Sequence, residues 1–350
     1  METRFAPDRL VEFVAAVFVA AGVSEVQARV TADRLIGADL RGRAGHGIIR
    51  VPSYVKRIQA GAINLNPNIT ICNETPMSAL VDGDNGLGQV VMTLATELAI
   101  DKAKVSGLAM VGTVHSNHAG AAGVYTAMAL GHDLAAMYFA VANANGLAPW
   151  GGRERLLGTN PIAASFPAGE EIPFQLDIAT TVASHGSIRV KQLAGEPMPE
   201  GWVIDADGNS ITDPRLVDDG FLVPIGGYKG SGLNIMIGVL AGVMTGAAFG
   251  RSVVNFRSDV TTPTNTGQSI IVIRPDLFMP MDEYKHEMDR QLREFRASES
   301  MTGEPVRLPG ERATELEIEQ RRLGIPVPAS LITDLNTVAE KLGIAARLTS

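Results

Sequence analysis

The sequence predicts an α/β fold in which the two ends of the chain form a separate helical body. Helical periodicity fills most of the first 61 residues, and charged amphipathic helices follow residue 281. Between about residues 76 and 275, short runs that are apolar on both faces alternate with helices, which is typical of buried strands. A chain of 350 residues also suits two domains. We therefore expect a helical domain from residues 1–75 and 276–350 and an α/β domain from residues 76–275.

Three helices are expected before residue 62. The first carries apolar residues at helical spacing: Leu10, Phe13, Val14, Val17 and Phe18. Ser24 and Gln27 have the spacing of a capping box, so they predict the start of the second helix. The third covers residues 46–61, with Pro52 marking either its start or a kink. Because the N-terminal and C-terminal segments each have too little core alone, we expect them to pack together.

The middle of the chain predicts the strands of a buried sheet. Residues 63–88 are rich in turns and hold short strands, and a helix runs over about residues 89–105. The expected buried strands lie within residues 107–114, 134–142, 161–167, 174–179 and 268–274. Glycines recur at every fourth position from Gly238 to Gly250, which predicts a closely packed core helix over residues 233–249 rather than a membrane span.

Composition excludes several function classes. A formal net charge of −8, with no run of basic residues, argues against nucleic-acid binding. Cys72 is the only cysteine, so neither an internal disulfide nor a cysteine-based zinc cluster is expected, and a reducing, cytoplasmic compartment is favoured. Charged residues near the N-terminus, including Arg4 and Asp8, argue against a signal peptide. No membrane association is expected.

The usual nucleotide motifs are missing. No Gly-x-Gly-x-x-Gly follows a strand, since "GLGQVV" lacks the third glycine and starts a helix. The lysine of "GGYKGSG" has the wrong spacing for a phosphate-binding loop. These motifs therefore indicate no more than an α/β enzyme and do not identify the reaction that it catalyses.

Most of the chain nevertheless resembles one family, the type-2 malate/L-lactate dehydrogenases, which also includes ureidoglycolate and sulfolactate dehydrogenases, diketogulonate reductase and cyclic-imine reductases. Eight blocks carry the resemblance in the family's order: "GHGIIRVPSYV", "NGLGQ", "HSNHAGAAGVY", "APWGGRERLLGTNPIA", "LDIATTVASHGSIRV", "GEPMPEGWVIDADGNSITDP", "VPIGGYKGSGL" and "LPGER". The resemblance implies a homodimeric oxidoreductase that moves a hydride between a nicotinamide cofactor and a 2-hydroxy or 2-keto acid. It also implies a non-Rossmann mixed sheet with flanking helices and makes residues 76–275 the cofactor-binding domain.

Three residues are the expected catalytic groups. Keto-acid reduction needs a proton donor near the carbonyl and a cation for the carboxylate, and His46 and Arg50 suit these roles. If this stretch is helical, their four-residue spacing places them on one face. His118 matches a second family histidine, and which of the two is the acid/base stays open. The same blocks imply further substrate-binding residues: Tyr54, Ser116 and Asn117.

Four positions depart from the family pattern. Gly45 replaces a serine that offers a hydroxyl, and Ala44 replaces an acidic residue. Ala119 stands at a phenylalanine position, and Ala142 where asparagine or lysine is frequent. The two latter alanines suggest a substrate that is bulkier or less polar than lactate.

The resemblance also assigns cofactor-binding residues: Gly158, Thr159, Asn160, Asp177, Ile178, Ala179, Lys229, Gly230, Gly310, Glu311 and Arg312. Lys229 precedes a helix, whose positive end favours a diphosphate. Asp177, at an expected strand end, either reaches a ribose hydroxyl or caps the next helix. A contact between Asp177 and the ribose hydroxyl would favour NAD, and NADP stays open as the alternative.

Other functions compete with the dehydrogenase. An NADPH-dependent cyclic-imine or diketo-acid reductase fits the same family. A cofactor-free hydrolase or lyase would use His46 and His118, and a binding protein that has lost catalysis is suggested only by Gly45. The His115-x-x-His118 spacing has no acidic or cysteine companions, so no metal site is expected, and Ser116 lacks a nucleophile-elbow context.

Overall fold

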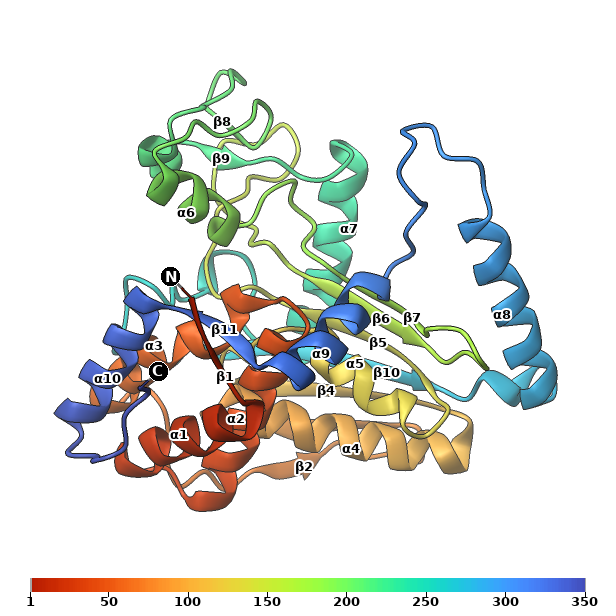
Figure 1. Ribbon diagram of the computed structural model, residues 1–350, viewed down its shortest axis with the longest axis horizontal. Helices are drawn as coiled ribbons and strands as arrows, with labels where there is room; N and C mark the ends of the chain where they lie inside the picture. Colours follow the sequence, from red (N-terminus) through yellow and green to blue (C-terminus); the bar gives the residue numbers. More distant parts are fainter. Residues whose placement is uncertain (1, 350) are drawn as a thin grey trace.

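A seven-stranded mixed sheet forms the centre of the molecule, which is a computed structural model describing residues 2–349 (Figure 1). In spatial order its strands are β2 (Thr70–Cys72), β3 (Ser78–Asp82), β4 (Leu108–Ser116), β10 (Thr266–Ile273), β5 (Ala135–Ala140), β6 (Ile162–Phe166) and β7 (Phe174–Ile178). Strands β3 and β4 run parallel, whereas the other neighbours are antiparallel. This confirms the expected non-Rossmann mixed sheet. Its central strand, β10, comes from late in the chain.

Helices cover both faces of the sheet: α4 (Gly88–Ser106) and α5 (Gly123–Leu130) on one, and α7 (Tyr228–Gly238) on the other. Alternate side chains of β5 explain the two layers, since Tyr138 packs with α4 and α5 whereas Phe139 packs with α7. The strands are therefore apolar on both faces because both faces are covered. The expected helix at residues 89–105 is confirmed with small shifts at its ends.

The glycine-striped helix differs from the prediction. Helix α7 continues only through a π-helical turn at Val239–Val243, because Gly246 and Gly250 adopt left-handed backbone with φ of 74° and 64°. The stripe does serve packing, since the Phe249 ring lies against Gly238. The helix is not wholly buried, because Met244 is 62% exposed. Among the described helices, none combines the length and the apolar character needed to cross a bilayer.

The two ends of the chain meet beside the sheet. Helices α1 (Pro7–Ala20), α2 (Glu25–Leu40), α3 (Val51–Gln59) and α10 (Ala329–Lys341) contribute to one apolar core. Ser24 accepts a hydrogen bond from the Gln27 amide at 3.4 Å, and Pro52 lies in the first turn of α3, so it marks a start rather than a kink. An unexpected two-stranded sheet joins β1 (Glu2–Phe5) to β11 (Ile325–Pro328).

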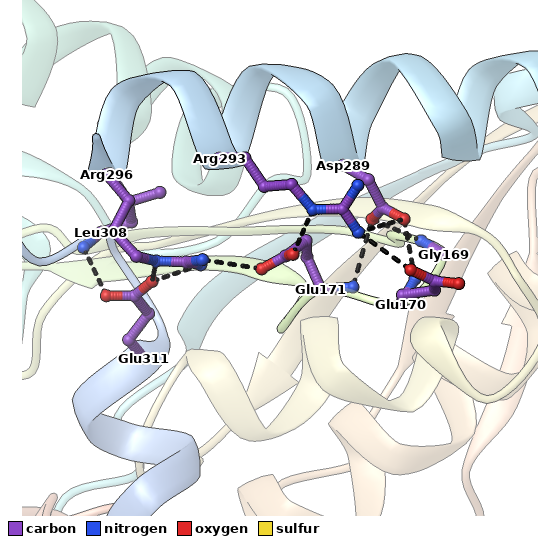
Figure 2. Close-up of polar contacts among 8 residues, drawn as sticks. All are labelled: Gly169, Glu170, Glu171, Asp289, Arg293, Arg296, Leu308 and Glu311. Atoms are coloured by element: carbon purple, nitrogen blue, oxygen red, sulfur yellow. Dashed lines mark hydrogen bonds and ion pairs between the residues drawn. The ribbon is translucent and has the colours of Figure 1, made fainter. Parts of the chain in front are cut away.

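Helix α8 (Met281–Arg296) does not join this terminal core. It lies along the hairpin between β6 and β7, and the Asp289 carboxylate accepts hydrogen bonds from the amides of Gly169, Glu170 and Glu171 (Figure 2). Arg293 and Arg296 of α8 both pair with Glu171. The charged face of this helix therefore holds it to the hairpin, which amphipathic periodicity alone did not indicate.

A small lobe stands above the sheet in Figure 1 and completes the fold. It contains α6 (His185–Ala194), β8 (Val203–Ile204) and β9 (Phe221–Leu222), around its own core of Ala183, Ile188, Met198, Val203 and Leu222. The remaining helix, α9 (Glu311–Leu323), begins next to β7, because the Gln175 amide donates to the Pro309 carbonyl oxygen at 3.0 Å. The N-terminal end of α9 thus lies near β7.

Candidate active site

The two expected histidines lie face to face. His46 ends a short 3-10 turn after α2, and His118 follows β4. Their ring centroids are 5.8 Å apart and the rings are inclined by only 10°. The segment is not the expected α-helix, because two 3-10 turns meet at Gly47. Gly47 leaves the space that the Asp39 carboxylate occupies, and this carboxylate accepts a hydrogen bond from the Ile48 amide at 2.8 Å.

Arg50 is a free cation beside the histidine pair. Its Nε donates to the Gly45 carbonyl oxygen at 2.7 Å, and within residues 2–349 no carboxylate lies within ion-pair distance of it. Burial, followed by the charges of Arg50 and Arg43, lowers the pKa of His46 to about 4. Burial and Arg50 likewise hold the pKa of His118 well below its usual range. Both imidazoles are therefore neutral at neutral pH, next to a guanidinium that can take a carboxylate.

His118 is held by a buried chain of hydrogen bonds. The Tyr54 hydroxyl lies 2.5 Å from His118 Nδ1, and Gln89 Nε2 donates to the same hydroxyl at 2.8 Å. Tyr54 and Gln89 are fully buried, and burial raises the pKa of the Tyr54 phenol. Tyr54 therefore supports a histidine, in contrast to the expected contact with substrate. Gln89 lies in the "NGLGQ" block, but no motif in that block assigns it a role.

An aromatic residue and a second arginine come from a loop that the sequence did not single out. The Phe256 ring lies 5.6 Å from the His118 ring, and the guanidinium of buried Arg57 lies 4.7 Å from the centroid of Phe256. Arg57 also donates to the carbonyl oxygen of Thr262 at 2.6 Å, which fixes the loop on α3. Arg257, the residue after Phe256, is the second arginine. Its pKa is lowered by burial and then by the charge of Arg50. Arg50 and Arg257 therefore approach the histidines from different elements.

The other polar residues of the "HSNHAG" segment point away from the histidine pair. Ser116 and Asn117 are fully buried, and Asn117 Nδ2 donates to the carbonyl oxygen of Gly86 at 2.8 Å. Both hold the end of β4 in place, which differs from the expected substrate contact. His115 turns outward, where its Nδ1 lies 3.0 Å from the Asp82 carboxylate. Within the described chain, no group of three or more metal-ligating residues forms.

Most of the expected cofactor residues gather at the C-terminal end of β7. The Thr180 amide donates to the carbonyl oxygen of Thr159, and the Ile225 amide donates to that of Thr180, each at 3.0 Å. These bonds bring the loop at residues 158–160 and the start of α7 to the strand end that carries Asp177, Ile178 and Ala179. Gly310, at the start of α9, packs instead against Gln175, the second residue of β7, so the expected residues 310–312 lie toward the other end of this strand.

The start of α7 has the features of an anion site. Gly226 and Gly227 turn the chain into the helix with φ of 59° and 65°, and Gly230 is buried in the first turn. Lys229 is exposed in this turn, and none of the described acidic residues pairs with it. Free amides at a helix N-terminus and a nearby cation together suit a diphosphate, so these residues fit a dinucleotide. Arg312 is a second exposed cation, in the first turn of α9.

Two of the expected cofactor residues are already satisfied by the protein. Buried Asn160 donates to Asn234 Oδ1 at 2.8 Å and accepts from the Ala142 amide at 3.0 Å. The Glu311 carboxylate accepts from Arg296 at 2.7 Å and from the Leu308 amide at 2.9 Å (Figure 2). Their side chains therefore hold the loops in position rather than facing a ligand.

Asp177 connects the two parts of the site through Arg43. Its carboxylate accepts from the Gly123 amide at 3.2 Å and lies 3.6 Å from Arg43 Nε. Burial raises the pKa of Asp177, and Arg43 opposes this rise. Because Arg43 also lowers the pKa of His46, the end of β7 and the histidine pair are neighbours.

Comparison with known proteins places these features in one family. The family model described as malate/L-lactate dehydrogenase matches residues 5–336. A malate dehydrogenase of Pyrococcus horikoshii is 38% identical over 97% of this chain and 96% of its own. The solved sulfolactate dehydrogenase of Methanocaldococcus jannaschii is 36% identical, covers 98% of each chain and superposes with a TM-score of 0.91. A delta1-piperideine-2-carboxylate reductase from Pseudomonas syringae has a TM-score of 0.83 at 29% identity, over 96% of this chain and 100% of its own. The chain therefore belongs to the malate/L-lactate dehydrogenase family.

Proposed function

We propose that this protein is a nicotinamide-dependent dehydrogenase of 2-hydroxy acids. The observation that carries the proposal is the neutral, stacked pair His46 and His118 beside Arg50, a cation without a carboxylate partner in the described chain. A hydroxyl or keto group needs a proton acceptor or donor, and the neighbouring carboxylate needs a cation. A hydrolase or lyase would leave the anion site at the start of α7 without a use.

Arg50 binds the substrate carboxylate and orients C2 toward the cofactor. Its planar guanidinium matches both carboxylate oxygens, and their negative charge offsets the cation that lowers the pKa of the two histidines. The histidine pair then exchanges the proton of the C2 hydroxyl. The nicotinamide supplies the acceptor or donor of the hydride.

The dinucleotide binds with its diphosphate at the start of α7, next to Lys229. Glycine-rich backbone at this helix end leaves its amides open to an anion. We propose NAD rather than NADP, because the Asp177 carboxylate at the end of β7 would repel a 2′-phosphate. Since Arg43 lies beside Asp177, the preference is expected to be modest.

The substrate carries a second anionic group. Arg257, next to the ring that packs on His118, has no ion-pair partner within residues 2–349 and adds a second cation to the site. This proposal differs from the expectation of a bulkier or less polar substrate, which rested on Ala119 and Ala142; of these two, Ala119 is buried. Two relatives are named for malate, a dicarboxylate, and for sulfolactate, which has a carboxylate and a sulfonate.

We also propose a homodimer in a reducing, cytoplasmic compartment. The outer face of α7 and its π-helical turn exposes apolar side chains that a second copy would cover: Ile235, Met236, Val239, Val243 and Met244. The compartment follows from Cys72 being the only cysteine, and it forms no disulfide.

The test is a 340 nm absorbance assay of the full chain with NAD or NADP and a panel of acids. The panel contains malate, sulfolactate, lactate, ureidoglycolate and, in the reductive direction, delta1-piperideine-2-carboxylate. We expect kcat/KM for malate or sulfolactate to exceed that for lactate at least about tenfold, since one charge-assisted contact is worth about 1.5–3 kcal/mol. No dinucleotide turnover with any member of the panel would contradict the proposal, and activity confined to the cyclic imine would favour the reductase.

A further inference from the structure

The hydrogen bonds behind His118 have a direction that bears on the proton chemistry. Gln89, in the first turn of α4, donates through its amide to the Tyr54 oxygen at 2.8 Å. The Tyr54 hydroxyl has one proton, and the acceptors near it are His118 Nδ1 at 2.5 Å and, at the longer distance of 3.3 Å, the His118 carbonyl oxygen. If the amide donates to the oxygen, the hydroxyl proton is free to point at Nδ1. If the amide carbonyl faced Tyr54 instead, the hydroxyl would donate to it and Nδ1 would have to carry a proton.

A backbone amide distinguishes these two directions. The Gly120 amide lies 3.4 Å from His118 Nδ1 and donates toward it. A backbone N–H cannot become an acceptor, so this long contact adds to the preference for a lone pair at Nδ1, which the shorter contact with Tyr54 sets. Gln89 Oε1 has no hydrogen-bond partner within the described chain, so no other described contact opposes this orientation of the amide. The chain therefore runs from Gln89 to Tyr54 to His118.

The direction of the chain fixes the tautomer of the imidazole. A neutral ring with a lone pair at Nδ1 carries its proton on Nε2. Nε2 has no partner within residues 2–349 and is not among the fully buried polar atoms, so it is available to a ligand. Burial and the charge of Arg50 keep the ring neutral, since they hold its pKa well below the usual range. In this state Nε2 can donate a hydrogen bond but cannot accept a proton.

We propose that Gln89 is a positioning residue that, through Tyr54, fixes His118 as a hydrogen-bond donor, so that His46 is the group that exchanges the hydroxyl proton. The second half of this statement rests on the proposed dehydrogenase function. During oxidation the hydroxyl proton passes to His46 while the C2–H bond breaks and its hydride leaves to the nicotinamide. His118 Nε2–H stabilises the same oxygen throughout, and reduction follows the reverse path. Both ring nitrogens of His46 lack partners in the described chain, so it is free to change its protonation state.

The tautomer can be read without any activity. Protein labelled with [15N]histidine is examined at pH 7.5 by NMR through two-bond couplings between the ring nitrogens and carbon-bound protons, and His118→Asn assigns the signals. We expect the wild type to show a protonated Nε2 and an unprotonated Nδ1 at His118. A protonated Nδ1, or two tautomers in comparable amounts, would overturn the proposal.

Gln89→Glu reverses the direction and gives the decisive comparison. An ionised carboxylate only accepts, so in spectra recorded above the pKa of this carboxyl, which burial raises, Tyr54 turns toward it and the His118 proton moves to Nδ1. The matched control is Gln320→Glu, because Gln320 is also a buried glutamine with an unpartnered Oε1 and lies in α9, away from both histidines. We expect the tautomer to change only in Gln89→Glu, and an unchanged His118 in both would contradict the role of Gln89. Gln89→Met removes the amide without adding charge, and it should give a mixture of tautomers.

Kinetics test the assignment of His46 separately. Gln89→Glu should lower kcat at least about tenfold while the acid KM changes less than about threefold, because a donor to the reacting oxygen is lost. Removal of His46, not of His118, should abolish the pH dependence of kcat. If the tautomer agrees but the wild type has no dehydrogenase activity, the proposed function fails and the role of Gln89 stands. If kcat keeps its pH dependence in His46→Gln, the assignment of the proton exchange is wrong.

Discussion

The two sides of the proposed active site are built in opposite ways. On the histidine side, His118, Tyr54 and Gln89 are bonded to one another in the interior, and Phe256 packs against them. On the dinucleotide side, the backbone amides at the start of α7 and the exposed Lys229 have no partners in the described chain. They are therefore open to a ligand. Proton transfer requires a fixed geometry before the substrate arrives, whereas a phosphate can be met by a mobile cation. Substitutions on the first side should therefore affect chemistry, and those on the second side should affect binding.

The largest effect is expected at His46. His46→Gln removes the proposed proton-exchanging group and should lower kcat by about 10² to 10⁴, which is the usual range for a general acid/base. The dissociation constant of NADH, measured by its fluorescence, should stay within about twofold. A loss of kcat smaller than about tenfold would show that His46 does not take the proton.

Arg50→Lys tests the carboxylate contact on the same side. Lysine keeps the charge but loses the paired hydrogen bonds, so kcat/KM for the acid should fall about ten- to a hundredfold. Titration with NADH should give an unchanged affinity, because the proposed diphosphate site lies at α7. Should the variant weaken NADH binding and spare the acid, Arg50 belongs to the dinucleotide side and the comparison fails.

Lys229→Ala tests the other side. The dissociation constant of NADH should rise about five- to tenfold, since one charged contact near a helix N-terminus is lost, while the acid KM stays unchanged. The effect should shrink as salt is added, because the contact is exposed. Lys56→Ala is the matched control, an exposed lysine on α3 with no ion pair among the described residues. Equal losses in both variants would show only a general effect of charge.

A further effect concerns stability. The folded pKa of His46, about 4, lies below its ordinary value of 6.5, so between these pH values the unfolded chain binds a proton that the folded chain does not. The wild type therefore loses stability as the pH falls through this window. Asp39, whose pKa burial raises to about 7, acts in the opposite sense but is present in both proteins compared. As the pH falls from 7.5 to 5, the free energy of unfolding of His46→Gln, measured with urea, should rise by about 1–2 kcal/mol relative to that of the wild type. An equal change in the free energy of unfolding of both proteins would contradict this.

The sequence predicted the buried parts of the fold better than the ends of its helices. Strands such as β5 and β10 are confirmed because burial on both faces leaves an unbroken apolar run. The glycine spacing predicted a helix that ends later than α7 does. The reason is that glycine, which packs closely inside a helix, also permits the left-handed turn that ends it. The pairing of β1 with β11 joins the two ends of the chain. Both strands have only four residues and β11 contains two prolines, so neither carries a local signal for this pairing.

For the site, motif positions were predicted but orientations were not. His46, His118 and Arg50 do come together, although the expected helix between His46 and Arg50 is absent. Family blocks mark where backbone must lie, so they include buried side chains such as Asn160 that contact only protein. Arg257 was missed because its loop lies outside every matched block and reaches the site only through the tertiary contacts of Phe256 and Arg57.

Hydrogen exchange of the full chain tests the division between the two sides most directly. Amide exchange is followed without ligand, with NADH, and with NADH and a 2-hydroxy dicarboxylate together, a pair that cannot react. We expect NADH alone to slow exchange at residues 226–232 and at the start of α9. Adding the acid should extend protection to residues 44–50 and to the loop around Arg257. Protection by NADH confined to residues 44–50, with none at residues 226–232, would contradict it.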